Sequence, residues 1–275
     1  MLFKRYPGPH AAGHQPCCVH RPHDIETDMT PERFKRISDM LAQRQLDLTV
    51  CMEEVHKPHN LAAIVRTADA IGIHRVHAVW PKSWIHKRKG TARGSQNWVD
   101  VKLHPDIGSA VTELKASGMQ ILATHLSDSS VDFRAIDYTR PTAILVGQEK
   151  HGIGEEALAL ADPHIVIPMV GMVQSLNVSV AAAAILYEAQ RQRELAGCYQ
   201  RGCPLSLEEQ NTILFEGGYP VYAQLCKEKE MPYPQLGPAG EIMADERWWQ
   251  QMQLTRKGWA AQQSDDPSEE YTDEA

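Results

Sequence analysis

Between residues 48 and 188 the chain alternates short, continuous apolar runs with amphipathic segments of helical periodicity. The apolar runs lie at 48–55, 75–80, 119–126, 142–147 and 164–169, an extended run lies at 98–104, and helical segments lie at 60–72, 106–118, 155–162 and after residue 177. Because most successive positions in these runs are apolar, both faces of the predicted strands should be buried. The order of strand, helix and strand therefore predicts an α/β protein whose parallel sheet is flanked by helices.

The segments outside this alternation differ from it in composition. Residues 1–28 hold four prolines and four histidines without periodicity, which predicts disorder or an extension upstream of the true start. Thr30 and Pro31 have the residue types of a helix N-cap and first turn, and the predicted sheet domain runs from residue 29 to 195. The pattern of residues 196–260 predicts a short, mainly helical C-terminal segment. The composition of residues 261–275 predicts an acidic, disordered tail.

The composition argues against a membrane protein and favours a cytoplasmic location. No apolar run approaches the roughly 20 residues of a membrane-spanning helix, and the N-terminus lacks the apolar core of a secretory signal. The six cysteines show no paired spacing, as expected for reduced thiols. The stretch "CCVHRPH" (17–23) matches no standard zinc-finger spacing, so we expect no metal ion.

The net charge of −7 is unevenly distributed along the chain. Residues 261–275 carry six acids and no Lys or Arg, and residues 1–28 carry three charges of each sign, which leaves −1 for the rest. Within that remainder, residues 82–98 carry five Lys or Arg and no acid. A near-neutral body with such a basic loop can still bind phosphates.

Three loops that follow predicted strands are rich in polar and glycine residues. They read "ATHLSD" (123–128), "GQEKHGIG" (147–154) and "PMVGMVQSLN" (168–177). Ligands of parallel α/β sheets bind at the carboxyl ends of the strands, so these loops are the candidate site. Ser175 and Asn177 open the last long helix, whose free amides offer hydrogen bonds and a partial positive charge.

A nucleotide-binding alternative rests on the glycines of the second loop. A Walker loop is excluded because Ile153, not Lys, follows Gly152. Gly152 and Gly154 with Ala157 give a GxGxxA pattern, but no acid stands about 20 residues later. An NAD-dependent oxidoreductase therefore stays open only as an alternative.

Three stretches together resemble a known family. "NLAAIVRTADAIG" (60–72), "AILVGQEKHGIG" (143–154) and "IPMVGMVQSLNVSVAAAAILYEA" (167–189) are similar, in order and context, to the three motifs of the SpoU (SPOUT) RNA 2′-O-ribose methyltransferases. The resemblance covers about residues 29–195. "DLTVCMEEVHKPHN", "MQILATHLSD", "MVQSLNVSVA" and "LFEGGYPV" are most similar to the TrmH branch, which methylates guanosine 18 of tRNA.

The resemblance implies S-adenosylmethionine as methyl donor, bound in a C-terminal trefoil knot, with tRNA as substrate and a homodimer as the working form. Another tRNA or rRNA ribose is an alternative target, and a catalytically idle RNA-binding relative is disfavoured because the polar motif residues are present. The implied cofactor contacts are Thr124, Gly147, Ile167, Met169, Ser175 and Leu176. The implied catalytic residues are Asn60, Arg66, Glu149, Ser175 and Asn177.

Arg66 matches the position of the family's catalytic arginine. A guanidinium stays charged in proteins, so we hypothesise that Arg66 grips an RNA phosphate and stabilises the developing alkoxide, which leaves the final proton acceptor open. Basic side chains of the first helix and of the 82–98 loop are the candidate RNA-binding residues. They are Arg33, Lys35, Arg36, Arg44, Lys87, Arg88, Lys89 and Arg93.

Overall fold

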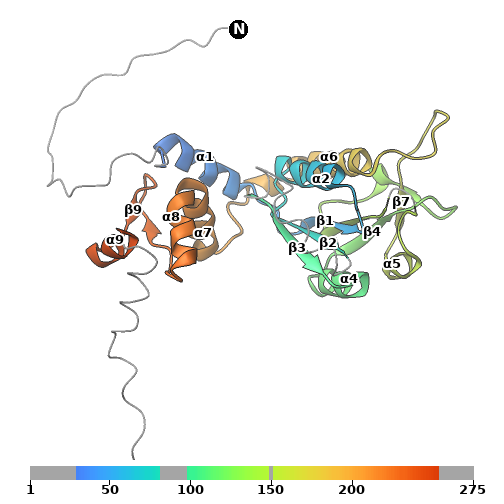
Figure 1. The fold of residues 1–275 in the computed structure, drawn as a ribbon. Coiled ribbons are helices and arrows are strands. Elements are labelled where there is room, and N and C mark those ends of the chain that lie inside the picture. Colours follow the sequence, from blue (N-terminus) through green and yellow to red (C-terminus); the bar gives the residue numbers. More distant parts are fainter. Residues whose placement is uncertain (1–28, 81–97, 149–150, 254–275) are drawn as a thin grey trace, which may run out of the picture.

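A computed structural model describes residues 29–80, 98–148 and 151–253 (Figure 1). The expectations for residues 1–28, for the 261–275 tail, for Glu149 and for the basic loop lie outside the described residues. The loop residues concerned are Lys87, Arg88, Lys89 and Arg93.

The centre of the molecule is a seven-stranded sheet in which every paired strand is parallel. Its strands are β1 (Leu48–Glu53), β2 (Arg75–Val79), β3 (Asp100–His104), β4 (Gln120–Thr124), β5 (Val131–Asp132), β6 (Thr142–Val146) and β7 (His164–Val166), in the spatial order β3-β2-β1-β6-β4-β7-β5. The predicted α/β class with a parallel sheet is confirmed; β5 was not expected from the sequence. The trefoil knot stays a prediction.

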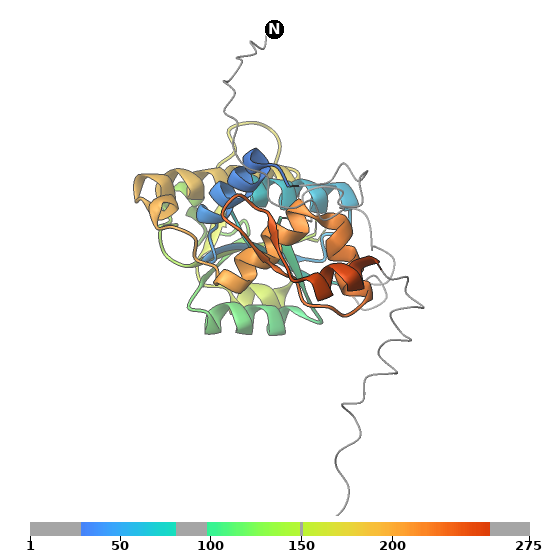
Figure 2. The ribbon, with the colours of Figure 1, turned by 90° about the vertical axis from the view of Figure 1, so that its left-hand side faces the viewer.

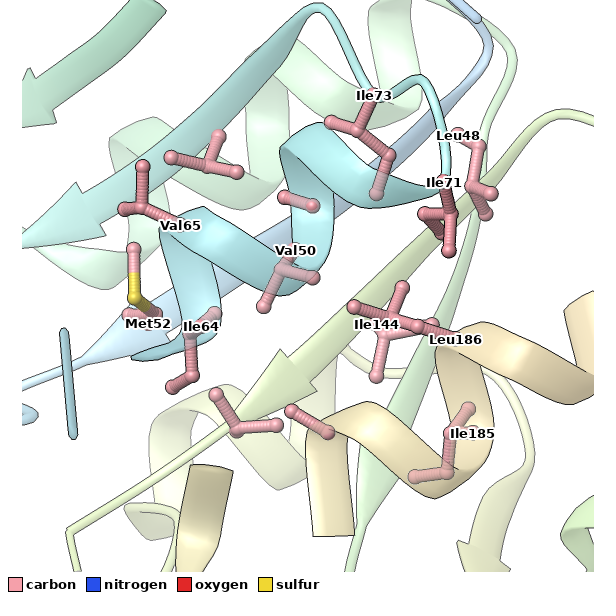
Figure 3. Packing of buried hydrophobic residues seen from close by; sticks show 14 of the residues in the cluster. Leu48, Val50, Met52, Ile64, Val65, Ile71, Ile73, Ile144, Ile185 and Leu186 are labelled. Atoms are coloured by element: carbon pink, nitrogen blue, oxygen red, sulfur yellow. The ribbon is translucent and has the colours of Figure 1, made fainter. Parts of the chain in front are cut away.

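Helices cover both faces of the sheet (Figure 1). The helices α2 (Pro58–Ala70) and α6 (Val178–Leu195) pack on one face, and α4 (Ile107–Ala116) and α5 (Glu155–Leu160) pack on the other. Val50 and Met52 of β1 lie in the first core with Ile64 of α2 and Ile185 of α6, whereas Cys51 points into the second core (Figure 3). Burial of both faces explains why the strand is apolar at successive positions.

The first helix shares its core with the C-terminal segment. The helices α1 (Pro31–Ala42), α7 (Leu207–Gly218), α8 (Pro220–Glu228) and α9 (Glu246–Gln253) form a helical unit with a short hairpin of β8 (Gln235–Leu236) and β9 (Ile242–Met243). Figure 2 shows this unit in front of the sheet. Sequence patterning grouped α1 with the sheet; in the structure its apolar residues Ile37 and Leu41 pack against Phe215 of α7.

The paired glycines of "LFEGGYPV" allow this close packing. A Cβ at Gly217 would lie 2.6 Å from Cη2 of Trp98, and a Cβ at Gly218 would overlap the side chain of Met29. Neither contact leaves space for a larger residue. The segment that resembles the TrmH branch therefore packs closely against Trp98 and Met29.

Arg44 is not available to RNA, and its expected role is corrected. The helix α1 ends at Ala42, so Arg44 lies beyond it and turns into the protein, where its side chain is buried. Its guanidinium donates to the carbonyl oxygens of Ile73 (2.9 Å) and Trp98 (2.6 Å) and pairs with Asp69 at 2.8 Å. Burial lowers the pKa of Arg44, and the Asp69 carboxylate opposes this effect.

A second buried arginine joins α6 to the start of the sheet. Arg193 has no exposed surface and donates to the carbonyl oxygens of Tyr138 and Asp47 at 2.8 and 3.0 Å. It also pairs with the Asp47 carboxylate at 2.5 Å.

The described part of the chain also has two short 3₁₀ turns, η2 (Phe133–Ala135) and η3 (Cys198–Gln200). Among the described helices, none is both long and apolar enough to cross a membrane.

Candidate active site

The carboxyl ends of four neighbouring strands meet at one rim of the sheet. The chain runs outward from β1 to β3 and re-enters at β4, and β6 then fills the place between β1 and β4. Such a change of direction in strand order is where ligands of open α/β sheets bind. The hydroxyl of Thr124 donates to the Leu145 carbonyl at 3.1 Å, so the end of β4 is fixed beside the end of β6.

The loop after β6 folds back as a tight turn. The backbone groups of Gln148 and Gly152 exchange two hydrogen bonds of 2.9 Å, and Gly152 adopts φ +70°. A Cβ at Gly147 would overlap the Gly152 carbonyl group, so only glycine fits there. The turn brings Gly154 to the start of α5 at the same rim.

Two acidic residues at the end of β1 hold this turn. The amide of Gly154 donates to the Glu53 carboxylate at 2.8 Å, which satisfies one of the free amides at the N-terminus of α5. Burial raises the pKa of Glu53, and the bond from Gly154 opposes this shift. The neighbouring Glu54 has φ 51°, and its carboxylate accepts a hydrogen bond from the side-chain Nε2 of Gln148. The sequence analysis missed both acids; their only signal was their position at a strand end.

The segment between β7 and α6 projects away from the sheet in Figure 1. Residues 170–177 are exposed, and within the described structure no backbone–backbone hydrogen bond involves residues 168–176. The apolar side chains of Met172 (98% exposed) and Val173 (61%) point into solvent. Free backbone donors and acceptors thus lie beside exposed apolar side chains.

The start of α6 is joined to the start of α2. Asn177 is the N-cap of α6, and its side-chain oxygen accepts from the Ser179 amide at 2.9 Å. Its side-chain Nδ2 donates to Oδ1 of the buried Asn60 at 3.2 Å. Asn60 lies in the first turn of α2, because that helix begins at Pro58, two residues earlier than the apolar pattern predicts. The hydrogen bond between Asn177 and Asn60 therefore connects the N-terminus of α6 directly to the N-terminus of α2.

Arg66 lies on the exposed side of α2. Within residues 29–80, 98–148 and 151–253, no hydrogen bond or ion pair engages its guanidinium. An exposed cation without an internal partner is available to an anionic ligand such as a phosphate.

Apolar side chains and backbone polar groups lie side by side at the rim. Ile167 and Met169 are half-buried and Leu176 is 37% exposed, so apolar contact area is available. Backbone groups of residues 168–176, which form no backbone–backbone hydrogen bond among the described residues, supply donors and acceptors beside it. Ligand pockets combine apolar walls with a few polar groups in this way.

Family models match both parts of the chain. The model described as the SpoU rRNA Methylase family matches residues 47–187, and a model described as SpoU, rRNA methylase, C-terminal, matches residues 191–245. The chain belongs to the SpoU rRNA methylase family.

Individual relatives support this membership of the SpoU family. The chain is 64% identical over 226 residues to an Escherichia coli K12 protein named tRNA (guanosine(18)-2′-O)-methyltransferase. The matched stretch covers 82% of this chain and 99% of that protein. A Thermus thermophilus protein of the same name is 55% identical over 174 residues, 63% of this chain and 90% of that protein. The crystal structure of the Aquifex aeolicus TrmH/SpoU tRNA modifying enzyme has a TM-score of 0.62 at 45% identity, covering 69% of this chain and 96% of that one.

The structure places the residues that the resemblance implies as cofactor contacts at the same rim. Thr124, Gly147 and Ile167 lie at the ends of β4, β6 and β7, and Met169, Ser175 and Leu176 lie in the segment before α6. Asn60 and Asn177 are in contact, whereas Arg66 contacts neither a motif-two nor a motif-three residue by any hydrogen bond among the described residues. The roles of these residues stay predictions.

The basic residues of α1 have different surroundings. Arg33 is exposed, but its guanidinium donates to the Gly217 carbonyl at 2.7 and 3.0 Å. Lys35 pairs with Asp39 at 2.6 Å, one turn further along the helix. Arg36 is exposed, and no described residue forms a hydrogen bond or ion pair with it. Arg36 is therefore the residue of α1 that is freest to contact phosphate.

Proposed function

We propose that this chain transfers a methyl group from S-adenosylmethionine to the ribose 2′-hydroxyl of guanosine 18 in the D-loop of tRNA. The observation that carries the proposal is the meeting of the three SpoU motif segments at one rim, with Asn60 and Asn177 in contact. The 64% identity to the E. coli enzyme over nearly its whole length supports the choice of nucleotide. The site of action is the cytoplasm.

The rim residues fit the proposed cofactor. Ile167, Met169 and Leu176 offer apolar contact to the adenosine, and the free backbone groups of 168–176 offer hydrogen bonds to its edge. When bound, the cofactor supplies an electrophilic methyl group on a sulfonium. Thr124 and Gly147 hold the turns that border the ligand, because the Thr124 hydroxyl is bonded to β6 and Gly147 permits the tight turn.

The exposed Arg66 contributes positioning and charge. Its guanidinium binds an RNA phosphate beside the reacting ribose and stabilises the oxyanion that forms as the 2′-hydroxyl loses its proton. Alignment of the hydroxyl with the methyl group can account for about 7–11 kcal/mol of the barrier. Asn60 and Asn177 set the position of α2, and thereby of Arg66, relative to the segment before α6.

A homodimer is the proposed working form. The projecting segment and the adjoining face of α6 expose apolar side chains of the size that single solvated domains rarely leave uncovered. These are Val170, Met172, Val173, Leu176, Val180 and Tyr187. A second copy covering them would also enclose Ser175. Sedimentation of Val180→Asp should show a monomer with little methyl transfer, whereas a wild-type monomer that methylates tRNA would contradict the proposal.

The geometry of the glycine-rich turn argues against the NAD alternative. The Gly154 amide, which would face a pyrophosphate in a dinucleotide site, is bonded to the Glu53 carboxylate. A second anion at that position would be repelled by the first. Calorimetric titration of the full chain distinguishes the two: we expect heat of binding for S-adenosylmethionine and none for NAD. The reverse result would overturn the proposed function.

A further inference from the structure

Two histidines and a glutamate form a compact cluster on the α4 face of the sheet. His77 of β2 and His104 of β3 are each 5% exposed, and His77 Nδ1 lies 2.8 Å from His104 Nε2. The rings are stacked with centroids 5.1 Å apart and an interplanar angle of 18°. Glu113 of α4 completes the cluster, and the three ligand atoms lie within 4.8 Å of one another.

We infer that His77, His104 and Glu113 form a site for a zinc ion that joins β2, β3 and α4. Two imidazole nitrogens and one carboxylate oxygen are a ligand set typical of zinc with a fourth position open to water. Ligands at about 2.0–2.1 Å from a tetrahedral zinc lie about 3.3 Å apart. The two ring nitrogens must therefore separate by about 0.5 Å, and the carboxylate must approach by at most about 1.5 Å.

The protonation states suit this role. Burial lowers the pKa of His77 to about 4, and His104 is shifted in the same direction by burial, so both rings are neutral near pH 7. In the metal-free pair, one ring donates its N–H to the other. Zinc takes lone pairs on both facing nitrogens, so the shared proton moves to the far nitrogen of its own ring and no proton is released.

The ammonium group of Lys102 lies at the solvent-exposed side of the cluster. Lys102 Nζ pairs with the Glu113 carboxylate at 2.6 Å, and their side chains are 40% and 38% exposed. The ammonium can turn into water and leave the carboxylate to the metal. Lys102 therefore competes with zinc, and Lys102→Gln should bind zinc more tightly than the wild type.

The site would stabilise one edge of the sheet. The strand β3 lies at the edge of the sheet and pairs only with β2 among the described strands. In this parallel pairing, Val79 lies opposite His104. A zinc ion bound by one residue from each of β2, β3 and α4 would lock this edge. The sequence analysis considered only residues 17–23 as metal ligands, because residues 77, 104 and 113 come together only through the fold.

The test is a titration of the chelator-treated full chain with Co²⁺ as a spectroscopic probe, followed by displacement with Zn²⁺. Other residues, including the cysteines and histidines of 17–23, can also bind metal, so variants are compared at matched conditions. We expect the wild type to bind one more equivalent than His104→Gln, and the visible absorption of that equivalent should be missing from the spectrum of the variant. The control His151→Gln changes an exposed histidine and should match the wild type.

Glu113→Gln provides a second variant, because its exposed side chain can change without disturbing the core. It should keep the fold and weaken Zn²⁺ binding at least tenfold, and the ring nitrogen resonances of His77 and His104 should shift when the wild type binds zinc. Equal stoichiometry in the wild type, His104→Gln and Glu113→Gln would overturn the inference. The outcome is independent of methyl transfer, which uses the opposite face and the strand ends.

Discussion

Asn177 Nδ2 donates to Asn60 Oδ1 at 3.2 Å, although the two residues are 117 positions apart in the chain. The bond joins the N-cap of α6 to the first turn of α2, and so joins the third SpoU motif to the first. Because Arg66 lies two turns further along α2, the distance from the proposed methyl donor to the proposed phosphate contact depends on this junction.

Substitution of Asn177 separates its cap of α6 from its hydrogen bond to Asn60. Asn177→Asp keeps the oxygen that caps α6 but replaces the donor that faces Asn60 with a second oxygen. We expect its free energy of unfolding to stay within about 0.5 kcal/mol of the wild type while methyl transfer falls at least tenfold. Asn177→Ala should lose about 1 kcal/mol in addition. Urea unfolding and a methyl-transfer assay measure the two effects, and a fully active Asn177→Asp would contradict the proposed junction.

Arg66→Lys tests the planar guanidinium. The substitution keeps the charge but loses the fork that binds a phosphate with two hydrogen bonds. Because Arg66 is exposed, stability and cofactor affinity should not change, whereas turnover should fall at least tenfold. The matched control is Arg201→Lys, at an exposed position outside the motifs. Near-normal turnover of Arg66→Lys would refute the bidentate role.

Arg44 and Arg36 should give opposite results. Arg44→Met removes a buried guanidinium from three partners and should lower the free energy of unfolding by about 3 kcal/mol. Arg36→Met should change stability by less than about 0.5 kcal/mol. For the affinity for tRNA, only Arg36→Met should reduce the slope of log Kd against log salt, by about one. A reduced slope for a folded Arg44→Met would restore Arg44 as an RNA contact.

The errors and successes of the sequence analysis have a common physical origin. Local patterns predicted the strands well, because burial on both faces requires a continuous apolar run such as that of β1. Arg44 was misassigned because its orientation depends on the helix ending at Ala42 and on distant carbonyl groups. Basic residues near a predicted helix carry no sign of which ones turn inward.

The contacts that assemble the candidate site are long-range and could not be derived from spacing. The Gly154–Glu53 bond spans 101 positions, and the Asn177–Asn60 bond spans 117. The resemblance to the SpoU motifs supplied Asn60 and Asn177 as separate candidates. Their contact, which links the helices, required the fold.

The histidine pair predicts a pH dependence of stability. Burial holds the pKa of His77 at about 4 in the folded chain, below its ordinary value of 6.5, so the unfolded chain takes up the proton first. The stabilisation is therefore fully present well above pH 6.5 and is lost as the pH falls through 6.5 towards about 4, by on the order of 3 kcal/mol. Urea unfolding with chelator present should show this decrease in the wild type and a smaller one in His77→Gln. An identical pH profile for the two proteins would contradict the account.

The central claim is that the three motif segments present a methyl donor to a tRNA ribose. The direct measurement incubates the full chain with labelled S-adenosylmethionine and a tRNA transcript, and maps 2′-O-methyl groups nucleotide by nucleotide. A matched transcript carries 2′-deoxyguanosine at position 18. The account predicts one methyl group, on guanosine 18 of the normal transcript and on no nucleotide of the deoxy transcript. Equal labelling of both transcripts, or none of either, would contradict it.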